Sequence, residues 1–444
     1  PTGISFFSFL AVGYVIDVYN ERIDAEKNPG KVAVYISFFP LLLSGPIERA
    51  KNIFPQIKNP CTFRYEVFVQ GLKLMLWGYF IKLVVADRIG IYIDTIQQNF
   101  ENVSNDTVLK ASIFYPFQVY ADLGGYSLIA IGSAKVMGFH VIQNFNRPFF
   151  ARSMSEFWRR WHISLITWLT DYLYTPLAFA FRRFKVSGIV IARMITFFLS
   201  GLWHGASVTL IIWGLFQGVF LSLEAITGRT RVTFEKKYDL KRNRSYTIIC
   251  ILITFIVFAS SQIIGRSEDL NEAALVFQRV YNSFGMKVLG IVFLFLVITC
   301  IGGYYSEKIL EKRTHLSDIF RQWGKKVFKL LIPFIFALLI MWIIFLFLPR
   351  VKSHVNSLDD IQGSGFQMLL ILKEHSKLFL SLFGISILLI KDFVDEFAPQ
   401  KVFLFENKRK IVRIISYSCV IILIFLIGVF SQSSFIYFNY KFFN

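Results

Sequence analysis

Two histidines lie within apolar and aromatic stretches, where an imidazole could carry out acid–base chemistry. His204 lies in residues 194–223, a run with no Asp, Glu, Lys or Arg. His162 follows the aromatic and basic run FWRRW at residues 157–161. A neutral imidazole is tolerated at membrane depth, where a fixed charge is costly, and polar groups at that depth are functional candidates. Burial lowers the pKa of a histidine and keeps it able to accept a proton from a hydroxyl.

A purely structural role is the alternative for each of these histidines. His204 could only hydrogen-bond to a neighbouring helix, and the Trp and Arg residues around His162 could only anchor a helix at the membrane surface. His140 ends an apolar run and is expected at an interface. The other histidines lie in polar linkers and are expected to be solvated: His315, His354 and His375.

Several other chemistries have no counterpart in the sequence. No third ligand stands at zinc spacing from the two histidines, and neither of them starts an HxxxxD pattern. The GxSxG, Walker A and GxGxxG patterns are missing. The four cysteines are scattered and form no CxxC pair. What remains is a buried histidine acting as general base in direct transfer of an acyl group from a thioester to an alcohol, which needs no metal.

The elements that carry the two histidines can be predicted from the same stretches. Residues 194–223 exceed the length of about 20 that one straight span requires, and Gly201 and Gly205 flank His204, so two helical pieces are expected to meet at a bend. Ser153 has capping-box spacing to Glu156, which predicts an interfacial amphipathic helix starting there. That helix would place Trp158, Trp161 and His162 on one face, with Arg159 and Arg160 elsewhere. This segment is a candidate site for an anionic or thioester-linked donor.

Composition places the chain among multi-pass helical membrane proteins. The 444 residues are 55% hydrophobic and 17% aromatic, and the mean hydropathy is +0.54. The net charge of +19 does not indicate nucleic acid, because the basic residues fall in short loops between apolar runs. Alternation of densely and sparsely basic linkers after residue 228 predicts that the dense ones are cytoplasmic and the C-terminus is outside.

Further segments can be assigned along the chain. Residues 32–43 are short for a span and are expected to be interfacial or re-entrant. The run 108–137 is expected to break at Asp122–Tyr126 and line a cavity, because a charge and paired glycines stand there. Residues 265–284 predict an amphipathic helix, and no fixed-period repeat is found. Later spans are expected at 246–264, 288–304, 330–348, 378–390 and 411–430. Because the chain begins with Pro1 and is apolar at once, we expect that sequence upstream is missing.

Four strings resemble the membrane-bound O-acyltransferase (MBOAT) family, and within it the AlgI-like branch of bacterial alginate O-acetylation proteins. They are SFFPLLLSGPIERA (37–50), DLGGYSLIAIGSAKVMGF (122–139), FWRRWHISLITWLTDYLYTPLA (157–178) and SGLWHGASVTLIIWGLFQG (200–218). Segments near both ends also fit that branch, so the resemblance runs through nearly the whole chain. The family usually has further helices before residue 1, which agrees with the expectation of missing upstream sequence.

The resemblance implies an all-α integral membrane fold of about ten spanning and re-entrant helices around a central tunnel. One domain would cover residues 1–444, with core motifs at 37–226 and C-terminal helices at 246–440. His204 matches the near-universal family histidine, the expected catalytic residue, and His162 matches the second, which would orient the acyl group or the acceptor. Donor or substrate binding is assigned to Trp158, Arg159, Arg160, Trp161, Asp171 and Trp203.

For function, the resemblance implies transfer of an acyl group, most simply acetyl, from a cytoplasmic thioester donor across the bacterial cytoplasmic membrane. The donor would be acetyl-CoA or an acyl carrier protein used as substrate, with no permanent cofactor and no metal. The acceptor would be an extracytoplasmic polysaccharide, reached directly or through a separate SGNH-type acetyltransferase partner. Two alternatives remain: D-alanyl transfer to teichoic acid by the same fold, and a proton-coupled transporter in which His204 relays protons. The transporter would require inverted repeats, and none is found.

Overall fold

A computed structural model describes residues 4–42, 45–59, 62–240, 243–283, 364–397 and 410–430. The chain divides into two compact units, residues 1–286 with 377–444 and residues 287–376. The elements discussed below belong to the first unit, except that α17 (Ser364–Phe397) begins in the second. The expected spans at 288–304 and 330–348 lie outside the described residues, so the count of about ten helices and the single domain stay predictions.

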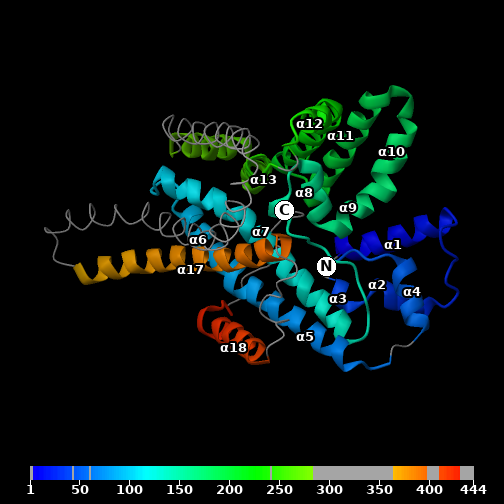
Figure 1. The fold of residues 1–444 in the computed structure, drawn as a ribbon, viewed down its shortest axis with the longest axis horizontal. Helices are drawn as coiled ribbons and strands as arrows, with labels where there is room; N and C mark the ends of the chain where they lie inside the picture. Colours follow the sequence, from blue (N-terminus) through cyan, green and yellow to red (C-terminus); the bar gives the residue numbers. More distant parts are fainter. Residues whose placement is uncertain are drawn as a thin grey trace, which may run out of the picture. The chain divides into compact units, whose positions relative to one another are not determined.

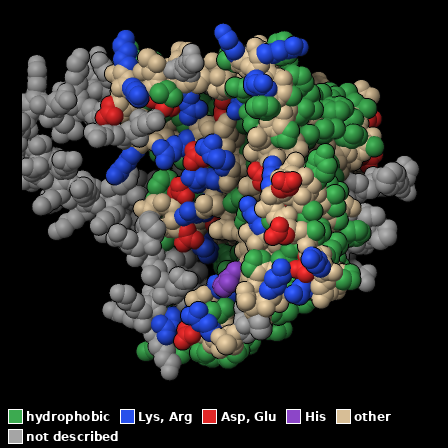
Figure 2. Space-filling view, turned by 90° about the vertical axis from the view of Figure 1, so that its right-hand side faces the viewer, with side chains coloured by type: hydrophobic (Ala, Val, Ile, Leu, Met, Phe, Trp, Pro, Cys, Tyr) green, Lys and Arg blue, Asp and Glu red, His purple; other side chains and the backbone are tan. Residues whose placement is uncertain are grey.

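Within the described residues the regular structure is entirely helical. Four helical stretches are long and apolar enough to cross a membrane: Tyr65–Gln98, Arg182–His204, Val208–Gly228 and Arg244–Arg266. Large apolar side chains point outward, as Ile248 and Ile256 do on α13 (Arg244–Arg266), and one face of the molecule carries a broad hydrophobic area beside a band of mixed charges (Figure 2). Such an exposed area is expected where lipid replaces water. The predicted class, an all-α integral membrane protein, is confirmed.

Three consecutive elements pack along α7 (Asn105–Val136): α5 (Tyr65–Phe80), the π-helix η1 (Ile81–Ala86) and α6 (Asp87–Gln98) (Figure 1). The predicted break at residues 122–126 is wrong, since α7 runs through them unbroken. Gly125 instead allows close helix contact, because a Cβ there would lie 2.9 Å from the carbonyl oxygen of Gly78. The buried charge of Asp122 is compensated within the bundle by Lys82, whose Nζ lies 2.5 Å from Asp122 and 2.7 Å from Asp87.

His204 is the last residue of α11 (Lys185–His204), and α12 (Val208–Lys237) follows after a short turn. The predicted interruption of residues 194–223 is therefore confirmed, but the chain reverses there instead of bending, and the two helices lie side by side (Figure 1). Ser207 caps α12 by accepting a hydrogen bond from the Leu210 backbone N–H at 3.3 Å. Gly201 permits the close crossing, because a Cβ there would overlap the carbonyl oxygen of Leu210.

Short helices fill the N-terminal region. α1 (Ile4–Tyr19) is followed by α2 (Pro29–Ile36), α3 (Phe39–Leu42) and α4 (Ala50–Lys58). The segment expected to be re-entrant or interfacial thus forms two helices that are each too short to span a membrane.

The remaining described helices follow α12. After α13, residues 270–283 form the predicted amphipathic helix, and Asp269 caps it by accepting a hydrogen bond from the Glu272 N–H at 2.8 Å. α17 (Ser364–Phe397) includes the apolar run expected at 378–390, and α18 (Lys410–Ile427) covers the run expected at 411–430 except its last three residues. The C-terminal part of α17 contacts the segment that carries His162, as described below.

Candidate active site

The segment before His162 begins as predicted and ends differently. The Ser153 hydroxyl accepts a hydrogen bond from the Glu156 N–H at 3.2 Å, so the predicted cap of α8 (Met154–Arg160) is confirmed. The helix stops at Arg160, however, and His162 adopts a left-handed conformation with φ 45° before α9 (Ile163–Leu169). The predicted helical face through His162 is therefore wrong. A non-glycine residue in this conformation costs about 1–3 kcal/mol and is held only where its surroundings impose it.

The two histidines meet in one small cavity of about 30 Å³. His162 comes from the turn between α8 and α9, and His204 comes from the end of α11. Both side chains are buried, with 1% and 8% exposed. Much of the wall is formed by the indole rings of Trp158, Trp161 and Trp213. Helix α13 adds Phe258, Gln262 and Gly265. Sequence reasoning thus identified both histidines and two of the tryptophans that surround them.

The alternative interpretation, that these tryptophans only anchor a helix at the membrane surface, does not fit their side chains. Trp158 and Trp161 are only 6% and 5% exposed and belong to the main hydrophobic core. Their burial shows that the segment folds into the bundle instead of lying along its surface.

Asn144 holds the His162 side chain. The His162 Nδ1 lies 3.1 Å from the Asn144 Oδ1, which also accepts hydrogen bonds from the Ser164 N–H at 3.3 Å and hydroxyl at 2.9 Å. The Asn144 Nδ2 donates to the Ser127 hydroxyl at 3.0 Å. His162 lies outside the four candidate spans, and burial, followed by the charge of His204, lowers the pKa of His162 from 6.5 to about 3. His162 is therefore neutral at physiological pH.

Aromatic rings hold His204. Its imidazole lies edge-on between two indoles, with ring centroids 4.7 Å from Trp203 and 5.0 Å from Trp213. Trp203 is half-buried and packs in turn against Phe9 of α1, at 5.3 Å between centroids. Trp203 thus contacts the histidine from behind and does not line the cavity.

A second, larger cavity of about 180 Å³ lies on the other side of Trp158, which lines both cavities. Two arginines line it, Arg159 of α8 and Arg193 of α11, together with polar side chains that include Ser155, Thr196 and Tyr174. A basic, partly apolar cavity suits an anionic group attached to an organic chain. Arg159, which the sequence analysis assigned to donor binding, therefore lies at this larger cavity.

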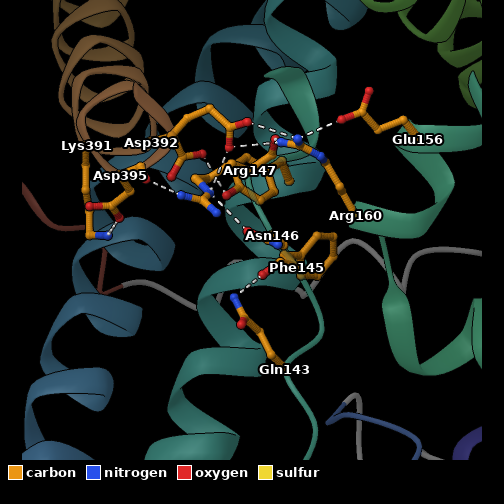
Figure 3. Close-up of polar contacts among 11 residues, drawn as sticks. Gln143, Phe145, Asn146, Arg147, Glu156, Arg160, Lys391, Asp392 and Asp395 are labelled. Carbon is orange, nitrogen blue, oxygen red and sulfur yellow. Dashed lines mark hydrogen bonds and ion pairs between the residues drawn. The ribbon is translucent and has the colours of Figure 1, made fainter. Parts of the chain in front are cut away.

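Arg160 points away from both cavities into a cluster of charges (Figure 3). Its guanidinium binds Glu396 of α17 with two hydrogen bonds, of 2.9 and 3.1 Å, and binds Glu156 at 2.7 Å. Burial alone would lower the pKa of Arg160, but the two carboxylates outweigh it and raise that pKa above its usual value. Arg147 also contacts Glu396, at 3.3 Å, and donates to the Asp395 carbonyl oxygen. The cluster fixes the segment around His162 to α17.

Asp171 lies apart from both cavities. Its carboxylate is half-exposed and binds Arg49 at 2.8 Å, and the Arg49 guanidinium stacks 4.5 Å from the Tyr172 ring. This arrangement joins Arg49 to η3 (Thr170–Tyr174). Of the residues assigned from sequence, the structure therefore gathers His162, His204, Trp158 and Trp161 in one cavity, places Arg159 in the next, and leaves Arg160, Asp171 and Trp203 outside both.

Sequence reasoning missed Asn144, Ser164 and Ser127. Asn144 stands in the string NFNRP, where a single amide gives no spacing signal, and its partner His162 is remote in sequence.

Among the described residues, no three His, Cys, Asp or Glu side chains lie where they could hold a metal ion together.

Comparison with known proteins shows which family this chain resembles. The family model of MBOAT, the membrane-bound O-acyltransferase family, matches residues 27–263. A probable alginate O-acetylase AlgI of Pseudomonas syringae is 37% identical over 285 residues, which cover 64% of this chain and 52% of that protein. A peptidoglycan O-acetyltransferase of Helicobacter pylori is 31% identical over 65% of this chain and 58% of its own length. A teichoic acid D-alanyltransferase of Bacillus subtilis is 27% identical over 57% of this chain and 65% of its own length. The matches span between half and two thirds of these relatives.

Proposed function

Because the chain belongs to the membrane-bound O-acyltransferase family, we propose that it transfers an acetyl group from a cytoplasmic thioester to a hydroxyl of an extracytoplasmic polysaccharide. The observation that carries this proposal is the shared cavity, in which two buried histidines from separate elements lie among indole rings. Similarity to an alginate O-acetylase and a peptidoglycan O-acetyltransferase favours acetyl as the group and a polysaccharide as the acceptor.

In this proposal His204 is the general base. The acceptor hydroxyl gives its proton to a neutral ring nitrogen of His204 as its oxygen attacks the thioester carbonyl. The tetrahedral intermediate then collapses to the ester, and the thiolate that leaves takes the proton from the imidazolium. A positioned base contributes about 10²–10⁴-fold to such a step. The small volume beside the histidines suits a two-carbon acyl group better than a long chain.

The donor would approach from the larger cavity. Arg159 and Arg193 there can bind phosphate groups, which both acetyl-CoA and the prosthetic arm of an acyl carrier protein possess. The acyl end would extend past Trp158 to the histidines, while the charged end stays with the arginines. We place the protein in a bacterial cytoplasmic membrane and expect a separate extracytoplasmic acetyltransferase of SGNH type as partner.

D-alanyl transfer to teichoic acid is the second candidate, favoured by the similarity to a teichoic acid D-alanyltransferase. The same base would serve both reactions. The two differ in the group released from the product, which makes them separable in one experiment.

The experiment compares cells that produce the wild type, His204→Ala and His140→Ala at matched membrane levels. Ester-linked acetate and ester-linked alanine are released from envelope and secreted polysaccharide by mild base and measured by mass. His140 is the control because its side chain is exposed and remote from the cavity. Loss of acetate in His204→Ala alone supports the proposal. Loss of alanine alone supports the second candidate, and no change in either overturns both.

A further inference from the structure

Asn144 determines which nitrogen of His162 carries the proton. The Ser164 backbone N–H can only donate, and it donates to the Asn144 Oδ1 at 3.3 Å. The atom facing His162 is therefore an acceptor, and this assignment does not depend on how the amide was oriented. The Asn144 Nδ2 meanwhile donates to the Ser127 hydroxyl at 3.0 Å. An acceptor 3.1 Å from the His162 Nδ1 requires that Nδ1 carry the hydrogen.

The surroundings make this arrangement rigid. Asn144 and Ser164 are fully buried, and Ser127 is 2% exposed. The backbone adds two hydrogen bonds between the same strands of chain, from the Ile163 N–H to the Asn144 carbonyl at 2.8 Å and from the Asn146 N–H to the Arg160 carbonyl at 2.9 Å. These bonds hold His162 in its left-handed conformation.

We infer that Asn144 is a positioning residue that fixes His162 as the Nδ1–H tautomer, so that the Nε2 of His162 is a hydrogen-bond acceptor toward the cavity it shares with His204. In this tautomer His162 has no second N–H to offer a thioester carbonyl or an oxyanion. It can accept an N–H from His204, which leaves the other nitrogen of His204 as the base. Such a bond in the reacting complex would place Asn144, His162 and His204 in series, with His204 taking the proton from the acceptor hydroxyl.

This inference rests on the proposed function for its catalytic consequence, but not for the tautomer itself. Removing the hydrogen-bond partner of a metal-bound histidine typically changes activity by roughly 10–100-fold, and we take the same range as the expectation for this metal-free histidine. We therefore expect Asn144→Leu, which is similar in size and offers no acceptor, to lower kcat roughly 10–100-fold with little change in KM. Asn144→Asp keeps an acceptor, so it should retain much of this activity.

Asn144→Asp should also change the pH dependence of kcat/KM, which would stay unchanged if Asn144 had a purely structural role. A carboxylate beside Nδ1 stabilises the imidazolium and raises the pKa of His162. The acid limb of the kcat/KM profile should shift to higher pH in this variant. Asn146→Leu is the matched control, since Asn146 lies in the same segment and its side chain accepts a hydrogen bond from Arg147 instead.

The direct test is ¹⁵N solid-state NMR of the histidine-labelled protein in lipid bilayers, with the His162 signals identified by their loss in His162→Gln. The inference expects a protonated Nδ1 and an unprotonated Nε2 in the wild type and in Asn146→Leu. It expects a mixed or reversed tautomer in Asn144→Leu. A wild-type His162 protonated at Nε2 alone, or an Asn144→Leu protein with unchanged tautomer and kcat, overturns it.

A double-mutant cycle separates positioning from general damage. If Asn144 acts through His162, Asn144→Leu should cost nothing further in a protein that already carries His162→Gln. Independent, multiplying losses would contradict the inference. The NMR result also separates the tautomer inference from the proposed acetyl transfer. If the tautomer is as expected but no acetyl ester is formed, only the proposed function fails.

Discussion

His162 and His204 line the same cavity, but different means hold them there. His162 stands in a strained turn, and one amide side chain with two serine partners fixes its orientation. His204 ends a helix, where indole rings and a glycine-mediated helix crossing fix its position. Ring contacts constrain where an imidazole lies but do not select which nitrogen is protonated, whereas a hydrogen-bond acceptor does both. The hydrogen bonds around His162 therefore fix both its position and the nitrogen that carries its proton, whereas the ring contacts around His204 fix its position alone.

Trp158 separates the two cavities and joins the two regions, so its truncation should have the largest effect on stability. Its ring packs on Phe197 of α11 at 5.2 Å and on Trp213 of α12 at 6.2 Å between centroids. Trp158→Ala should lower the free energy of unfolding by about 3–5 kcal/mol, and Trp158→Phe by much less. Thermal unfolding in detergent measures both. Equal losses would show that ring volume at this wall is unimportant.

The helix crossing can be tested at Gly201. Gly201→Val would force side-chain atoms into the Leu210 carbonyl and the nearby Gly214 backbone, which should cost about 3 kcal/mol of stability. The cost should also displace His204 and lower acyl transfer. Gly228→Ala is the control in α12, because no atom lies within 4 Å of its added Cβ. If both variants unfold at the wild-type temperature, the crossing does not depend on the missing Cβ.

The charged cluster around Glu396 should contribute less. Glu396→Gln removes the charge shared by Arg147 and Arg160, whose ion pairs with it are partly solvent-exposed, and should lower the free energy of unfolding by about 1–2 kcal/mol. We expect the loss to shrink when Arg160→Gln is already present, because the two residues share one interaction. Simple addition of the two losses in chemical unfolding would argue against the cluster.

Asp171 should matter least. Its carboxylate is half-exposed and pairs with Arg49 at the surface, so Asp171→Asn should change the free energy of unfolding by about 0.5 kcal/mol or less. Acyl transfer in the same variant should stay at the wild-type level, since Asp171 lines neither cavity. A strong loss of transfer with an intact fold would restore the binding role assigned from sequence.

Sequence patterns identified what depends on local chemistry. The helical membrane class follows from hydropathy, the cap of α8 follows from Ser153 and Glu156, and both histidines stand out against apolar neighbours. Sequence patterns failed to predict features that depend on contacts between residues far apart in the sequence. The break expected at residues 122–126 does not form, because Lys82 compensates Asp122 and Gly78 accommodates Gly125. Asn144 carried no signal, because its role exists only once the chain brings it to His162.

The central claim, that the shared cavity performs acyl transfer with His204 as base, is tested most directly in everted membrane vesicles. Radiolabelled acetyl-CoA is supplied on the cytoplasmic face, and label that becomes ester-linked is released with hydroxylamine and counted. The account predicts background incorporation for His204→Ala, an intermediate level for His162→Gln, and no further loss when both changes are combined. Incorporation by His204→Ala at the wild-type rate would contradict it.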